Sequence, residues 1–548
     1  MPWQMANLTL IAALVCVLLI SVGGEGASGQ TASPAPAPPA APPAGPKWTV
    51  VPASGPAWKA DAPILHRTVD LKVGELQEVV LPGGAKAAVK LLSIETQKDD
   101  LRQAVRCALV KVQINGREAT LSSAMYNLPQ AAGGVQADCT VVGEMKANSR
   151  GNPWGLDADV RIRLWPAGSP WIEPNSFGYP VRQRWFAGPT QMANEPTYVD
   201  GVESPTDKKI YYHYGLDFGG AEGLIDVLSA TDGLVVSAGD QWLAGYQDTP
   251  SQPRYDTVYV LDARGWFHRY SHLISIDPSA KVGRTVKRGD KLGTLGKEGD
   301  SGGWSHLHYQ ITARMPSGKW GIEEGYAFMW QAYLAEQKPK VIAVARPHAL
   351  ASAGGTIELD GSKSWSAAGK IEKYEWTFTD GSTPGAGPAD SSAAAGDKTG
   401  KTASGAKATR KYDKPGQYCE TLKVTDSAGN VDYDFTIVQI IDKDKPKETP
   451  PGIHLAYAPT MGLRPAQEIT FKVRTFGTTF GQETVDFGDG TEPVKVKSDG
   501  AVDEMAKDGY AVFKHAFAKA GLYVVTARRA NERGQEGVTR VLGVVENP

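Results

Sequence analysis

Two histidines one residue apart, His306 and His308, lie in SGGWSHLHYQI (301–311) of a chain with 9 histidines in 548 residues. In a β-strand, residues two positions apart point to the same side, so a strand here would direct both imidazoles into one cavity. Histidine can bind a metal or move protons near neutral pH. The alternative is a pair of surface histidines, and only further ligand-type residues nearby decide between the two.

Further ligand-type residues, His213 and Asp217, occur in YYHYGLDFGG (211–220). Their spacing of four fits a helix, but Gly215 between them and two glycines after them favour a strand end that runs into a tight loop. Such a loop can fold Asp217 back toward His213. Two histidines and one carboxylate form a ligand set that suits zinc and leaves a fourth position for water.

A third segment, GWFHRYSHL (265–273), places His268, Tyr270 and His272 at alternating positions. On a strand these side chains share one face, so at least one of them could reach the same cavity. We expect His268 to lie next to the site or on the surface.

The elements that position these residues are expected to be mainly strands. Residues 48–185 form a predicted β-rich domain, in which Asn115-Gly116 between two alternating runs predicts a hairpin. The next predicted domain, 186–337, holds five of the nine histidines and closes with a helix at 326–337.

The N-terminus predicts export. Residues 1–29 are a predicted signal peptide or anchor, because the apolar run 8–22 has the length of a signal sequence and is short for a membrane span. The preceding MPWQMAN has no Lys or Arg, so an uncleaved anchor stays open. Residues 30–47 are a Pro/Ala-rich linker. In an oxidising compartment Cys107 and Cys139 could pair, or they could remain free thiols.

The last third of the chain contains an internal repeat. Gly416 and Tyr418 recur as Gly521 and Tyr523, 105 residues later. The pattern predicts two copies of one β-module, at 338–444 and 445–548. The insert at 382–405 is low in apolar residues and is predicted to be a mobile loop in the first copy.

Three blocks together resemble the lysostaphin-type (LytM-type) zinc metallopeptidases: His213-x-Gly-x-Asp217, Tyr-Ser-His272-Leu, and His306-Leu-His308-Tyr. The resemblance covers about residues 208–315. One departure is Trp304-Ser305, where the family commonly has Gly-Pro, and this would place a bulky ring at the cleft wall.

This resemblance implies a role for each site residue. One Zn²⁺ per chain would be held by the metal ligands His213, Asp217 and His308. His272 and His306 would be catalytic histidines that do not bind the metal. Zinc polarises a peptide carbonyl and acidifies bound water, and a histidine can take the proton of that water.

The repeats resemble polycystic-kidney-disease (PKD) modules, through YEWTFTDG and GQYCETLKVTDSAGN in the better-matching first copy. Such modules are immunoglobulin-like β-sandwiches found outside cells. We expect them to act as spacers that extend or position the enzyme.

We therefore predict a mostly β, multidomain protein, with a central β-rich metallopeptidase domain flanked by β-sandwich-like modules. The implied activity is a zinc endopeptidase that hydrolyses peptide bonds of peptidoglycan, in cross-links or stem peptides, by attack of a metal-bound water. The location would be periplasmic, cell-surface or extracellular. A membrane would be met only through an uncleaved anchor.

Two other functions stay open: a non-catalytic envelope-binding or regulatory protein that retains the peptidase fold, and a secreted peptidase of Gly-rich proteins. The presence of all three predicted ligands favours the enzyme. The net charge of −2 offers no basic excess for phosphates, so nucleic acid is not an expected partner.

Overall fold

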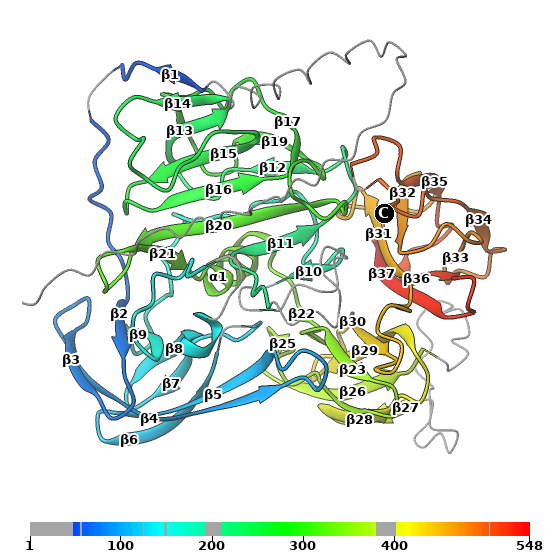
Figure 1. Cartoon of the computed structure of the whole chain (residues 1–548), viewed down its shortest axis with the longest axis horizontal. Helices are drawn as coiled ribbons and strands as arrows, with labels where there is room; N and C mark the ends of the chain where they lie inside the picture. The colour runs from blue at the N-terminus through cyan, green and yellow to red at the C-terminus, as the bar shows by residue number, and fades with distance from the viewer. Residues whose placement is uncertain are drawn as a thin grey trace, which may run out of the picture. The chain divides into compact units, whose positions relative to one another are not determined.

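The computed structural model describes residues 48–547 apart from 55–56, 124, 147–150, 192–194, 196–209, 380–401 and 504. In this part of the chain nearly all regular structure is β-strand, together with one α-helix (Figure 1). The predicted mostly β, multidomain architecture is therefore confirmed. The predicted signal or anchor at 1–29 and the linker at 30–47 lie outside the described residues. No helix among the described residues has the length and apolar composition needed to cross a bilayer.

Two four-stranded antiparallel sheets form the N-terminal part, in the orders β3-β4-β5-β6 and β2-β9-β8-β7, over one shared apolar core. At the turn between β5 and β6, Asn115 and Gly116 have φ values of 48° and 80°, the left-handed pair that a two-residue hairpin needs. The predicted hairpin is confirmed. The strands are β2 (Arg67–Leu71), β3 (Leu76–Val80), β4 (Lys86–Lys98), β5 (Val105–Ile114), β6 (Arg117–Ser122), β7 (Gln130–Ala132), β8 (Val135–Val142) and β9 (Val160–Pro166).

A central sheet with the order β1-β14-β13-β15-β16-β20-β11-β10 carries the histidine-rich segments. β18 and β21 also pair with it, and a small sheet has the order β12-β19-β17. Because β11, β20 and β16 are neighbours, three segments far apart in the sequence meet. The strands are β1 (Thr49–Val51), β10 (Thr190–Gln191), β11 (Leu216–Gly219), β12 (Asp226–Leu228), β13 (Gly233–Gly239), β14 (Gln241–Leu243), β15 (Arg254–Asp262), β16 (Phe267–Ser271), β17 (Leu273–Ile276), β18 (Thr285–Val286), β19 (Lys291–Leu295), β20 (His306–Arg314) and β21 (Trp320–Glu323).

The first described strand, β1, pairs in parallel with β14 of this central sheet. Trp58 Nε1 continues the contact by donating to the carbonyl of Asp262 at 2.9 Å. The segment that enters the N-terminal sheets thus first runs along the central one. The predicted domain limits at 185/186, 337/338 and 444/445 remain predictions.

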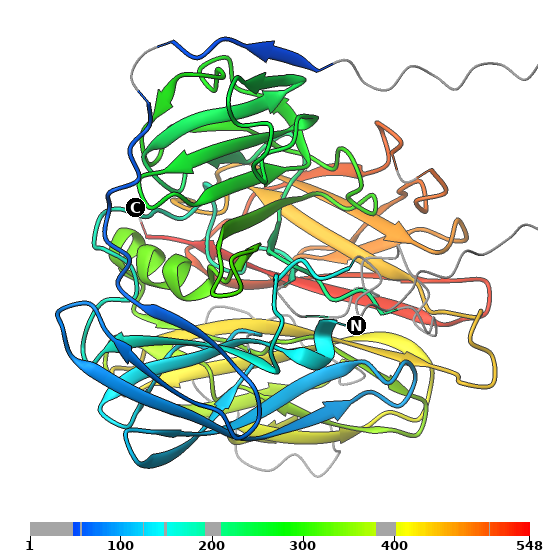
Figure 2. The same cartoon turned by 60° about the vertical axis from the view of Figure 1, so that its left-hand side comes forward.

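The predicted helix at 326–337 is confirmed as α1 (Tyr326–Gln337), seen beside the green strands in Figure 2. It contributes buried aromatic residues to the core of the central sheet. Trp185 packs between Trp330 and Tyr333, at ring-centroid distances of 5.3 and 5.2 Å. Besides these tertiary contacts, the Glu324 carboxylate accepts the backbone N–H of Tyr326 at 2.8 Å and so satisfies the first N–H of the helix.

The C-terminal third is built of strands from both predicted modules. One sheet joins them in the order β23-β30-β29-β37-β36-β33-β34, and β31-β32-β35 form a second sheet. The strands are β22 (Val341–Ile342), β23 (Ala349–Ser352), β24 (Thr356–Asp360), β25 (Trp365–Ser366), β26 (Ile371–Thr377), β27 (Thr402–Ser404), β28 (Lys407–Lys411), β29 (Gly416–Asp426), β30 (Val431–Ile441), β31 (Gly452–Ala458), β32 (Ile469–Phe476), β33 (Glu483–Asp486), β34 (Val494–Val496), β35 (Ala511–His515), β36 (Gly521–Ala530) and β37 (Glu536–Val545).

The repeat seen in the sequence has a structural counterpart. Tyr418 at the start of β29 donates its hydroxyl to the carbonyl of Lys414 at 2.9 Å, and Tyr523 in β36 donates to Lys519 at 2.8 Å. Most of the predicted mobile insert lies outside the described residues. Its last residues, Thr402–Ser404, are the strand β27, paired with β26, and not part of a loop.

The described cysteines, Cys107, Cys139 and Cys419, are all free thiols. Of the two alternatives left open for Cys107 and Cys139, the structure thus has the unpaired one.

A buried charge cluster ties the N-terminal sheets to the central sheet. Arg163 of β9 has no exposed surface and bonds Asp138 of β8 and Glu323 of β21, both at 2.6 Å. Replacing Arg163 by methionine would leave buried carboxylates without their cation. We expect the free energy of unfolding to fall by about 3–5 kcal/mol, measured by urea unfolding.

The matched control is Lys111→Met. Its ion pair with Glu118 is exposed, so the expected loss is below about 1 kcal/mol. Equal losses in the two variants would contradict the importance of the buried cluster.

Candidate metal centre

Three adjacent strands bring the predicted site residues to one place. In the antiparallel pair of β11 and β20, Asp217 stands opposite His308, and Gly219 stands opposite His306. On the other side of β20, Ser271 at the end of β16 pairs with His308, and His272 is the next residue along the chain. His306 and His308 share one face of β20, as their spacing predicted.

Gly215 lets His213 fold over this face. Its φ is +122°, and a Cβ there would lie only 2.9 Å from His308 Cε1, so a side chain would be both strained and obstructed. The sequence predicted a strand that ends before a loop. Instead the turn comes first, and Asp217 lies within the strand β11. The observed turn brings His213 and Asp217 together, as the predicted loop would have done.

His213, Asp217 and His308 each offer one ligand atom to a common point, with these atoms within 4.8 Å of one another. The Asp217 carboxylate lies 2.9 Å from His308 Nδ1 and 3.1 Å from His213 Nε2, and the two nitrogens are 3.1 Å apart. Ligand atoms of a tetrahedral zinc, at bonds near 2.0–2.1 Å, are about 3.3 Å apart. The donor set and its spacing therefore fit a small divalent metal.

The electrostatics of the cluster also suit metal binding. Burial alone would raise the pKa of Asp217, but His213, His306 and His308 hold it well below its ordinary value. Burial lowers the pKa of His308 to about 4 and lowers the pKa of His306 well below its ordinary value. At neutral pH the cluster thus offers the ionised Asp217 carboxylate and the neutral His308 imidazole, the forms that bind metals.

His306 and His272 are oriented by backbone carbonyls. His306 Nδ1 lies 3.0 Å from the carbonyl oxygen of Trp304, and His272 Nδ1 lies 2.6 Å from that of Glu298. Because a carbonyl only accepts, Nδ1 of each ring is the donor, and in the tautomer with this single proton Nε2 is an acceptor. The two rings are 4.7 Å apart, and His306 Nε2 lies 3.4 Å from Asp217 Oδ2. Two proton acceptors therefore stand beside the candidate ligands.

Asp256 and Arg254 support His272. Neither of these two supporting residues was identified from the sequence. The fully buried carboxylate of Asp256 accepts the backbone N–H of His272 at 2.9 Å and two hydrogen bonds from Arg254. His272 has a φ of 68°, a conformation that the surrounding contacts must hold in place. Asp256 lies 16 residues away on another strand, so no local pattern marks the pair.

Comparison with known families gives the same assignment as the motifs. Residues 211–318 match the model of peptidase family M23, and residues 337–440 match the model of the PKD domain. The chain contains a peptidase family M23 domain. The family resemblance seen in the sequence is confirmed, and the M23 domain supports a peptidase.

The other similarities are partial. A 92-residue stretch, 17% of this chain, is 33% identical to collagenase ColA of Clostridium perfringens, but it spans only 6% of that relative. Helicobacter pylori Csd3 is 14% identical over 51% of this chain and 84% of its own, with a TM-score of 0.18. Fibronectin(III)-like modules of Clostridium thermocellum CbhA are 13% identical over 38% of this chain and 94% of theirs, with a TM-score of 0.14.

His268 takes no part in the M23 site. It is fully buried, its Nδ1 lies 2.7 Å from the Tyr309 hydroxyl, and its Nε2 lies 3.3 Å from Asp262. The expectation that it would lie next to the site or on the surface is wrong. The preceding alternation continues only to Ser271, where β16 ends, and His272 turns toward the site beyond the strand.

The side chains of the candidate site, His213, Asp217, His272, His306 and His308, are 3–6% exposed. A polymer could reach them only if part of the surrounding chain moved. Burial also keeps water away from the cluster, which strengthens its electrostatic interactions.

The loop before His306 is held by the C-terminal module. Arg474 donates to the carbonyl of Gly303 at 2.5 Å, and the N–H of Ser305 donates to the Tyr510 hydroxyl at 2.7 Å. Between these anchors the Trp304 ring stacks on His306 at 3.9 Å and 17°. The bulky ring predicted for the cleft wall thus contacts a predicted catalytic histidine. We call Arg474 and Tyr510 the loop anchors.

Proposed function

We propose that this protein is an exported zinc endopeptidase that hydrolyses peptide bonds of peptidoglycan. The observation that supports this most is the convergence of His213, Asp217 and His308 beside two further histidines within an M23 domain. His213, Asp217 and His308 would hold the zinc. His272 and His306 would be the catalytic histidines.

When bound, zinc would polarise the scissile carbonyl and make a water molecule more acidic. The chain itself supplies two imidazoles whose Nε2 atoms can accept a proton and return it to the leaving amine. Once protonated, either ring can also donate a hydrogen bond to an oxyanion, an effect worth a few kcal/mol. Asp256 keeps His272 in its orientation throughout.

The proposed location and substrate are supported by the parts of the chain outside the M23 domain. The apolar N-terminal run and the Pro/Ala-rich segment favour export, and a PKD domain together with the partial likeness to a collagenase supports an extracellular role. We propose the bacterial envelope as the site of action. Peptidoglycan cross-links or stem peptides are the proposed substrate.

The test uses the purified full chain with isolated peptidoglycan and mass spectrometry of the fragments released. We expect new peptide termini, loss of release after chelation, and recovery with one zinc per chain. Stoichiometric zinc without any release would favour the non-catalytic envelope-binding protein. Cleavage of Gly-rich proteins alone would favour the secreted peptidase.

The loop anchors give a further prediction. Tyr510→Phe removes the acceptor for the Ser305 N–H, so the loop before His306 should shift while the metal ligands stay in place. We expect hydrolysis to slow by about tenfold or more, because small misplacements of reacting groups are costly, with zinc content unchanged.

Tyr457→Phe is the matched control for this prediction. Tyr457 is equally buried in the same module and donates one hydrogen bond, to the Leu542 carbonyl, away from the loop. An equal loss of hydrolysis in both variants would attribute the effect to general destabilisation.

A further inference from the structure

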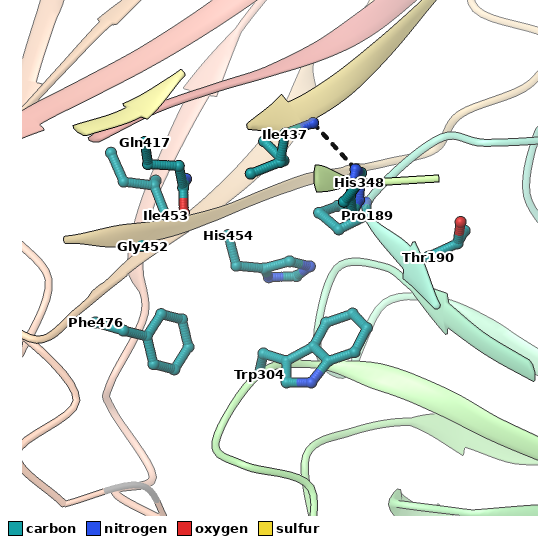
Figure 3. Close-up of a pocket in the computed structure, with 10 residues that line it drawn as sticks. All are labelled: Pro189, Thr190, Trp304, His348, Gln417, Ile437, Gly452, Ile453, His454 and Phe476. Carbon is teal, nitrogen blue, oxygen red and sulfur yellow. Dashed lines mark hydrogen bonds between the residues drawn. The ribbon is translucent and has the colours of Figure 1, made fainter. Parts of the chain in front are cut away.

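A pocket with about 560 Å³ of empty space, part of it open to solvent, lies where the M23 site meets the C-terminal modules (Figure 3). Trp304 lines it from the loop before His306. His348 and Ile437 line it from the PKD-matching part of the chain, and Ile453 and His454 line it from β31. Segments far apart in the sequence therefore build one pocket.

Both histidines of the pocket carry their proton on Nε2. His348 Nδ1 accepts the backbone N–H of Ile437 at 3.0 Å, drawn as the dashed line in Figure 3. His454 Nδ1 lies 2.8 Å from the hydroxyl of Tyr510, and His454 is the one acceptor found for that hydroxyl among the described residues, so we assign the Tyr510 proton to this hydrogen bond. In the neutral rings, Nε2–H is then a donor in each case.

Three N–H donors of pocket-lining residues have no acceptor: His348 Nε2, His454 Nε2 and Trp304 Nε1 are buried without a hydrogen-bond partner among the described residues. A buried donor left without a partner is destabilising, and such groups are uncommon in native proteins. Their concentration around one pocket points to an acceptor that is not part of the chain.

The lining favours an uncharged acceptor. No Lys, Arg, Asp or Glu occurs among the ten residues that line the pocket. Burial lowers the pKa of both His348 and His454 to about 3, so both rings are neutral. Arg346 and Arg474, near these histidines, are each paired with a carboxylate, of Asp434 and Asp499. A buried anion would lack a partner cation here.

Pro189, Ile437, Ile453 and Phe476 supply apolar walls, and the other lining residues are Thr190, Gln417 and Gly452. We propose that the pocket binds an acyl-amide group, whose carbonyl oxygen accepts from these N–H donors while its small apolar part contacts the aliphatic and aromatic walls. Since Trp304 stacks on His306, the occupant contacts the ring that packs on a catalytic histidine. Its role as a substrate subsite rests on the proposed function.

Calorimetric titration of the full chain tests the binding. The probes are an N-acetylglucosamine trisaccharide and N-acetyl-alanine amide, which present the same group on a sugar or on a peptide. The controls are cellotriose, which lacks the acetamido group, and acetate, which carries a charge. We expect saturable binding of at least one acylated probe, and the better one identifies the source.

Two kinds of variant locate the binding. His348→Phe and His454→Phe each remove a donor and should weaken binding by about tenfold, whereas His515→Phe, outside the pocket, should not. Gly452→Leu should fill the pocket and abolish binding. Gly452→Ala should be tolerated, because its Cβ would lie 3.4 Å from Gln417 Oε1, an ordinary contact.

No saturable binding of either acylated probe, or binding that is unchanged in Gly452→Leu, would overturn the proposal, as would a high-resolution structure with water alone on the three donors. The result is separable from the peptidase proposal through Asp217→Ala. That variant should lose hydrolysis and keep probe binding. If the wild-type chain binds a probe but hydrolyses no peptidoglycan, the pocket proposal is supported and the peptidase proposal is rejected.

Discussion

Replacing Asp217 by alanine should abolish zinc binding and, with it, hydrolysis. Asp217 supplies the sole carboxylate of the three-residue cluster and lies directly opposite His308 in the sheet. Removing it leaves two imidazoles, of His213 and His308, and no negative charge for a divalent cation. We expect zinc affinity to fall by more than about a hundredfold, beyond what loss of a supporting contact produces. Metal analysis of the dialysed variant measures this independently of activity.

Asp226→Ala is the matched control. Asp226 belongs to the same part of the chain, but it is half-exposed and pairs with surface cations. Its removal should leave one zinc per chain. Full zinc occupancy in Asp217→Ala would show that the ligand set is misassigned.

His306→Ala should keep its zinc, unlike Asp217→Ala, but it should also lose activity. Its Nε2 is an acceptor beside the ligand cluster, and its Nδ1 is held by Trp304. Removing a proton acceptor or an oxyanion donor typically slows a reaction by about 10²–10⁴-fold. We expect hydrolysis to fall by that factor while zinc stays at one per chain.

His268→Gln controls for loss of a buried histidine in the same domain. It should reduce stability through the lost contacts with Asp262 and Tyr309, but leave zinc content and the activity of the folded protein unchanged. Equal metal loss in His306→Ala and Asp217→Ala would mean that His306, rather than its neighbour, binds the metal.

Local patterns explain what the sequence predicted correctly. The Asn115-Gly116 hairpin and the helix Tyr326–Gln337 depend on turn chemistry and periodicity within a few residues. The candidate residues were found because His213-x-Gly-x-Asp217 holds two candidate ligands, and His306-x-His308 holds one candidate ligand beside a proposed catalytic histidine. Gly215 is the clearest case, since its positive φ is what allows His213 to face Asp217.

The orientation of the proposed catalytic histidines could not be predicted in this way. His272 depends on Asp256 and on the carbonyl of Glu298, and His306 depends on the stacked ring of Trp304. His268, which shares its alternation with His272, is a core residue instead. Alternation names the side chains on one face, but it does not say where the strand ends.

The sequence by itself determined the mostly β architecture, the M23 motif blocks with their residue types, and the repeat in the last third. Only the tertiary structure decided that Arg474 and Tyr510 anchor the loop before His306, that Arg163 joins two sheets, and that His348 and His454 meet Trp304 at one pocket. The physical reason is the separation of the contacting residues along the chain. A turn or a strand is set by neighbouring residues, whereas these contacts join residues from 44 to 205 positions apart, through packing that no local pattern encodes.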